Sequence, residues 1–153
     1  MCLFGSYLLT LHFSGYGSQT LRASSAWSKT EEFNETAVSA TNHLIVVAGH
    51  SVTISGNVNR ANVDESAWFL YDYMKGKGLP QAITGHLRAG IAEARRDGNS
   101  LLVFSGGETR SAVGPISEGG SYYRVADALG LWEEGVRSRT ATEEYATDSF
   151  QNL

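Results

Sequence analysis

Two glycine-containing segments place polar side chains directly after apolar, β-branched runs of the sequence. The residues concerned are Gly49 and His50 after the first run, and Ser105, Gly106, Gly107, Thr109 and Arg110 after the second. Paired glycines let backbone N–H groups approach an anion closely, and a threonine hydroxyl and a guanidinium both donate to phosphate or carboxylate. These residue types predict a site for a small anionic or nucleotide-like ligand. A tight turn that binds nothing is an equally weighted interpretation of the glycines.

Three side chains are candidates for acid–base chemistry: Glu118, Glu144 and His50. Imidazole exchanges protons near neutral pH, so His50 is either a general base or ligand-binding group, or a loop histidine without a role. Glu118 falls in the first turn of an expected helix, where the helix dipole stabilises a carboxylate without any active site. Glu144 lies in an acidic stretch that is also typical of a solvated edge. The sequence therefore assigns no catalytic role.

Several common catalytic motifs are absent from the chain. There is no His-Glu-x-x-His, no cysteine pair and no dense aspartate cluster, which argues against a metal site. Gly-x-Ser-x-Gly and Gly-x-x-x-x-Gly-Lys are also missing, which argues against a serine hydrolase elbow and a P-loop. No metal is expected, and the cofactor and the reaction both stay unknown.

Hydrophobic patterning predicts the strands that position these residues. Continuous apolar runs at 44–48 and 101–104 predict strands that are buried on both faces of a parallel sheet. The polar segment from His50 to Val63 is long for a plain connection, which is typical of a binding loop or a local insertion. The stretch from Arg137 to Ala146 is expected to be extended.

Helical spacing of apolar residues, with capping residues before them and glycines or arginines after them, predicts the helices. The expected helices run from Glu65 to Lys75, from Pro80 to Arg96, from Ser117 to Gly130, and onward from Ser149 with Thr147 or Asp148 as its cap. Strands separated by helices predict an α/β fold. We expect a Rossmann-like parallel sheet with flanking helices, incomplete at the C-terminus because the last helix has barely begun.

One domain is expected over residues 42–153, after a flexible leader at 1–41 that contains a short helix around 30–38. The net charge of −4 and the pI near 5.5 argue against a nucleic-acid partner, which would need clustered Lys and Arg. The apolar start is about a dozen residues long, too short for a membrane span of roughly 20. A single cysteine and the lack of a basic signal start favour a cytoplasmic location. The oligomeric state stays open.

The order of these segments resembles the domain of unknown function 218 family, the ElyC, SanA and YdcF-like proteins, and especially its fungal cytoplasmic branch. The resemblance covers about residues 43–153. It rests on Ile-Val-Val-Ala-Gly-His at 45–50, Leu-Leu-Val-Phe-Ser-Gly-Gly at 101–107, Ser-Glu at 117–118, and Glu-Tyr-Ala-Thr-Asp-Ser-Phe-Gln-Asn at 144–152. The last block is similar to the family's Glu-x-x-Ser-x-x-Thr-x-x-Asn, with Thr147 and Ser149 as departures.

The resemblance implies a Rossmann-like fold whose polar blocks gather around one cleft at the strand ends. The pocket residues that it implies are Gly49, Ser105, Gly106, Gly107, Glu118, Glu144, Ser149 and Asn152. It also implies a further helix and strand, so a C-terminally truncated chain is expected. The leading hypothesis is a domain that binds a small anionic or nucleotide-like ligand at the carboxyl ends of the strands, and the alternative is a truncated, non-catalytic fragment without independent activity.

Overall fold

A four-stranded sheet lies at the centre of the computed structural model, which describes residues 21–22 and 39–152. The strands follow one another across the sheet as β1 (Leu21–Arg22), β4 (Thr140–Glu143), β3 (Ser100–Ser105) and β2 (His43–Ala48). β2, β3 and β4 are parallel to one another, and β1 is antiparallel to β4. The predicted strands at 44–48 and 101–104 and their parallel pairing are confirmed.

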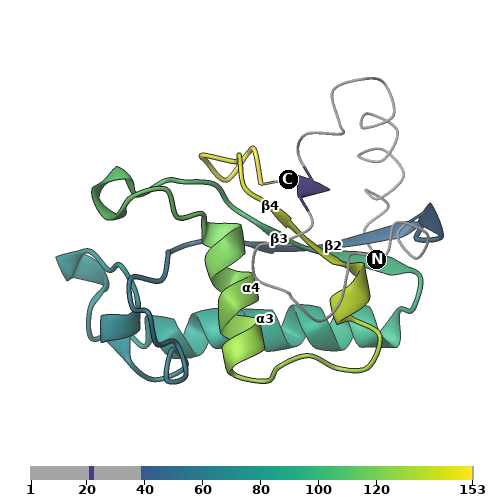
Figure 1. The fold of residues 1–153 in the computed structure, drawn as a ribbon, viewed down its shortest axis with the longest axis horizontal. Helices are drawn as coiled ribbons and strands as arrows, with labels where there is room; N and C mark the ends of the chain where they lie inside the picture. Colours follow the sequence, from purple (N-terminus) through teal and green to yellow (C-terminus); the bar gives the residue numbers. More distant parts are fainter. Residues whose placement is uncertain (1–20, 23–38, 153) are drawn as a thin grey trace.

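Two helices connect the parallel strands: α3 (Leu79–Arg96) joins β2 to β3, and α4 (Glu118–Ala128) joins β3 to β4. Pro80 lies in the first turn of α3, as predicted, because a proline there lacks only an N–H that has no helical partner. Both helices lie on the same side of the sheet (Figure 1). The strand order and the connecting helices make the chain an α/β, Rossmann-like domain.

The two faces of the sheet contribute to separate apolar clusters. Leu102 and Phe104 face the helices and pack in the larger cluster with side chains such as Leu87 and Val125. The opposite face holds a smaller buried cluster formed by Leu101, Val103 and Ala141. Burial on both faces explains why β3 is a continuous apolar run with no alternation in the sequence.

The predicted helix from Glu65 to Lys75 is wrong. The segment contains two short 3-10 helices, η2 (Glu65–Ala67) and η3 (Asp72–Met74), with extended residues between them. Trp68 forms an antiparallel bridge with Thr53, and its indole N–H donates to the Ala61 carbonyl oxygen at 2.8 Å. Burial of this large side chain against the preceding loop decides the conformation, so tertiary packing overrides helical spacing.

The segment from His50 to Val63 packs into the core over part of its length. Val52 and Ala61 are fully buried, and Val58 is nearly so. An added layer of core, rather than a solvated binding loop, accounts for the length of this connection. Of this segment, His50 lies at the candidate site.

The C-terminal segment differs from the prediction in part. The expected extended stretch between Arg137 and Ala146 contains the 3-10 helix η5 (Arg137–Arg139) and strand β4. The helix expected from Ser149 is a single turn, closed by the Asn152 N–H donating to the Asp148 carbonyl oxygen at 3.2 Å. Asp148 does act as its cap, because its side chain accepts from the backbone N–H groups of residues 150 and 151.

In the leader expected at 1–41, Leu21–Arg22 form β1, and the expected short helix around 30–38 lies outside the described residues. Within the described ranges, no helix is both long enough and apolar enough to cross a membrane.

Candidate functional site

A polar pocket of about 160 Å³ opens at the carboxyl ends of the parallel strands. It is lined by Gly49, His50, Thr109, Arg110, Glu118, Ala146, Thr147, Asp148, Ser149 and Asn152. The loops after β2 and β3, the start of α4 and the turn after β4 all contribute to it. The pocket therefore lies where ligands collect in open parallel sheets, as the sequence predicted.

Glu118 is the most buried charged group in this lining, with only 4% of its surface exposed. Ser117 caps α4, because its hydroxyl accepts from the Gly120 N–H at 3.0 Å, and this fixes Glu118 in the first turn. The Thr109 hydroxyl donates to the Glu118 carboxylate at 2.6 Å, and an Arg110 nitrogen lies 3.7 Å from the same oxygen. The buried Glu118 carboxylate thus lines the pocket, with the Thr109 hydroxyl and the Arg110 guanidinium beside it.

Gly49 and Gly106 provide the space that the Glu118 side chain occupies. A Cβ added to Gly49 would lie 2.5 Å from the Glu118 Cβ and 2.5 Å from its Oε2, and one added to Gly106 would lie 2.8 Å from each. Real side chains do not approach so closely. The missing side chains of these two glycines therefore leave room for the Glu118 side chain.

The expectation that the glycine amides bind an anion is wrong. The Gly49 N–H donates to the Ser105 carbonyl oxygen at 2.6 Å, and those of Gly106 and Gly107 donate to the carbonyl oxygens of Glu143 and Ala146 at 2.9 and 2.7 Å. The first N–H groups of α4 are used in the same way, since those of residues 118 and 119 donate to the carbonyls of residues 107 and 106. The backbone donors hold the loops together, so side chains must recognise any ligand.

Arg110 connects the pocket to neighbouring loops. Its guanidinium donates to the His50 carbonyl oxygen at 3.1 Å and lies over the Tyr71 ring, with Cζ 5.2 Å from the ring centre. The Nε of Arg110 is buried and has no hydrogen-bond partner among the described residues. A buried N–H without an acceptor costs free energy.

Ser105, Asn152 and Glu143 form a partly buried network beside the pocket. The Ser105 hydroxyl lies 2.8 Å from the Glu143 carboxylate and 2.8 Å from the amide group of Asn152. One hydroxyl proton serves only one acceptor, so an Asn152 amide turned to donate to Ser105 satisfies all three groups. Ser105 is therefore a structural link between β3 and the turn after β4, and Asn152 also lines the pocket.

Glu144 lies apart from Glu118. It lines a second pocket, of about 200 Å³, together with Ser117, Ser121 and Arg124. Its carboxylate accepts from the hydroxyls of Ser117, at 2.9 Å, and Thr142, at 2.8 Å. Glu144 therefore fixes the end of β4 against the start of α4, and the structure does not bring it into the polar pocket.

Tyr122 is buried near Glu118, and His50 lines the polar pocket. Burial raises the pKa of the Tyr122 phenol far above its ordinary value, and the nearby Glu118 charge raises it further, so Tyr122 stays protonated. His50 also borders an apolar groove of about 470 Å³ between β2 and α3, where the exposed His86 lies.

Of the ten predicted ligand-binding residues, the structure brings Gly49, His50, Arg110, Glu118, Ser149 and Asn152 into the pocket lining. Thr147 and Asp148, the two expected caps of the last helix, also line the pocket, because the chain after β4 forms a single turn there. No group of three His, Cys, Asp or Glu side chains gathers among the described residues.

Comparisons of the chain with family models, with curated proteins and with solved structures gave no match. The fold and the pocket therefore carry the functional argument on their own.

Proposed function

We propose that the polar pocket binds a small anionic or nucleotide-like ligand, with Arg110 as the group that holds its negative charge. One observation carries the proposal: Arg110 is the arginine of the pocket lining, and its side chain is 20% exposed. A guanidinium offers paired donors that match a phosphate or a carboxylate. His50 borders the same space, and a ring N–H of its imidazole offers a further donor.

The two carboxylates of the lining narrow the ligand class. Glu118 and Asp148 accept hydrogen bonds and repel a bare anion, whereas a sugar hydroxyl donates to them. A molecule that carries both a phosphate and a hydroxylated sugar matches one arginine and two carboxylates. The volume of about 160 Å³ lies below the roughly 300–1,000 Å³ of common ligand pockets, so it suits a phosphosugar.

We expect Arg110→Ala to weaken the binding of ribose 5-phosphate by about 10- to 100-fold, because charge-assisted hydrogen bonds of about 1.5–3 kcal/mol are lost. Isothermal titration calorimetry on the full chain measures the change. Arg88→Ala is the matched control, since Arg88 is exposed on α3 away from the pocket lining. Absence of ribose 5-phosphate binding to the unaltered chain, or equal binding by Arg110→Ala, would contradict the proposal.

We also propose membership of the domain of unknown function 218 family. In support, residues of all four sequence blocks lie at one edge of the sheet, around Glu118 or directly behind it. A crystal structure of a family member tests this, since superposition should align Gly49, Glu118 and Asn152 with the corresponding residues. Blocks in a different spatial order would contradict it.

This proposed membership implies that the protein is fungal and cytoplasmic. The single cysteine supports a reducing compartment. Microscopy of the fluorescently tagged chain in a fungal cell tests the location, and signal confined to the secretory pathway would contradict it.

A further inference from the structure

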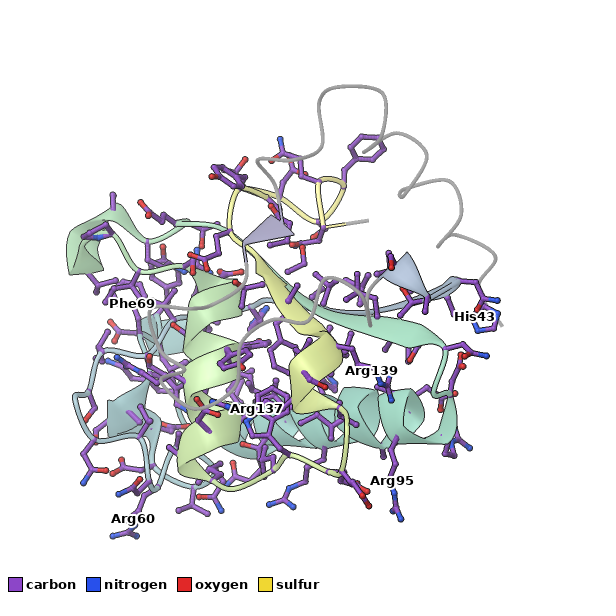
Figure 2. The ribbon with its side chains drawn as sticks, turned by 45° about the vertical axis from the view of Figure 1, so that its right-hand side comes forward. His43, Arg60, Phe69, Arg95, Arg137 and Arg139 are labelled. Atoms are coloured by element: carbon purple, nitrogen blue, oxygen red, sulfur yellow. The ribbon has the colours of Figure 1, made fainter. Side chains whose placement is uncertain are left out.

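Two exposed tyrosines lie near Arg110, one of the residues that line the polar pocket. Tyr71 is 41% exposed and Tyr73 is 70% exposed, and their rings are stacked with an interplanar angle of 10° and centres 5.7 Å apart. Phe69, which is labelled in Figure 2, contacts Tyr71 edge-on with the ring centres 5.3 Å apart. We call the rings of Tyr71 and Tyr73 the tyrosine platform.

Arg110 connects the tyrosine platform to the pocket. Its guanidinium covers the Tyr71 ring at 5.2 Å, and one of its nitrogens lies 3.7 Å from the Glu118 carboxylate. A single side chain therefore contacts both the aromatic surface and the buried acid. Tyr71 and the pocket are near enough for one ligand of nucleotide size to touch both.

The loop that carries the platform is held in place by its own contacts. Met74 is buried, and its N–H donates to the Tyr71 carbonyl oxygen at 2.8 Å. The Gly76 N–H donates to the Glu65 carboxylate at 2.8 Å, which closes the loop on its other side. The backbone that carries the two rings is thus held in place before a ligand arrives, which lowers the entropy cost of stacking.

We propose that the tyrosine platform stacks the base of a nucleotide whose phosphate and sugar occupy the polar pocket. This inference rests on the proposed function and names its ligand class. A pocket of about 160 Å³ has no room for a base beside a phosphosugar, so the base lies outside, and the platform is the aromatic surface that contacts Arg110. Every base has a π face, so stacking on tyrosine needs no particular base.

Calorimetry of the full chain with adenosine 5′-monophosphate and with ribose 5-phosphate tests the inference. The monophosphate is expected to bind roughly tenfold or more tightly than the sugar phosphate, because base–aromatic stacking is worth about that factor. Tyr73→Ala is expected to remove this difference while ribose 5-phosphate binds as before. Tyr73→Phe, which keeps the ring, is expected to retain the difference.

The outcomes separate the two proposals. Equal affinities for the two ligands, or a difference that survives in Tyr73→Ala, overturn the stacking role and leave the phosphosugar pocket intact. Failure of both ligands to bind overturns the pocket proposal and the stacking role with it. The inference is also overturned if the chain self-associates, Tyr73→Ala abolishes that association, and the base adds no affinity. The platform is then a contact between copies of the chain.

Discussion

Gly119→Ala is expected to destabilise the domain by about 3 kcal/mol, the upper range for a side chain forced into a packed interior. An added Cβ would lie 2.5 Å from the Phe104 carbonyl oxygen and 2.8 Å from the Glu143 carbonyl oxygen. Both are backbone atoms of the sheet, so only a shift of α4 relieves the contact. Since α4 carries Glu118 in the adjacent position, the same shift should also weaken ligand binding.

Gly85→Ala is the matched control for this change. Gly85 is exposed in the middle of α3, and an added Cβ there meets nothing within 4 Å. Alanine is the better helix former by about 0.5–1 kcal/mol, so this variant should be more stable than the unaltered chain. Thermal melts of the three proteins measure both effects. A Gly119→Ala melting temperature within about 2 °C of the unaltered chain, where about 3 kcal/mol predicts at least roughly 6 °C, would show that α4 does not approach the sheet so closely.

The parallel sheet and both long helices could be predicted because their sequence signals agree with their packing. Leu102 and Val103 are neighbours that are buried on opposite faces, and only a strand inside a covered sheet needs an apolar residue at every position. Pro80 and Ser117 mark helix starts through backbone chemistry that does not depend on the rest of the fold. Local rules were sufficient for these elements.

The segment after Asp64 shows where local rules fail. Trp68 and Leu70 are buried while Tyr71 is exposed, an alternation that suits an extended chain. The Phe69 N–H donates to the Val52 carbonyl oxygen at 2.9 Å, a partner that lies 17 positions earlier. The spacing of the apolar residues in this segment is compatible with a helix and with an extended chain. Only the long-range contact decides between the two conformations.

At the site, the sequence predicted the place better than the chemistry. Strand ends locate the segments after Ala48 and Ser105 at the same edge of a parallel sheet, and the structure confirms this. Of the two interpretations of the glycines, an anion-binding backbone or a tight turn, the first is wrong, because their amides bond within the protein and Glu118 occupies the space beside them. The partners of the glycine amides depend on how β4 pairs with β3 and on where α4 begins. The spacing of the glycines does not predict either feature.

Arg139→Ala is expected to destabilise the domain by about 3 kcal/mol, although the residue lies far from the pocket. Arg139 is only 8% exposed, and its guanidinium donates to the Ser100 carbonyl oxygen at 2.6 Å and to the Ala94 carbonyl oxygen near the end of α3. Its charge also lies at the negative end of that helix, where a cation is favourable. Alanine removes the guanidinium donors from these buried carbonyls, and a buried partner left unmet costs about 1–3 kcal/mol.

Arg95→Ala provides the comparison, since Arg95 belongs to α3 and is exposed, whereas Arg139 reaches the same helix from η5 and is buried (Figure 2). The Arg95 side chain is 66% exposed and pairs with Glu133 at 2.7 Å. Surface ion pairs contribute about 0–1 kcal/mol, so chemical denaturation should show little change for Arg95→Ala and a large loss for Arg139→Ala. Arg139→Lys should recover only part of the loss, because an ammonium cannot span carbonyls that a planar guanidinium reaches together. Equal stabilities for Arg139→Ala and Arg95→Ala would mean that the junction of α3, β3 and η5 is not held by this side chain.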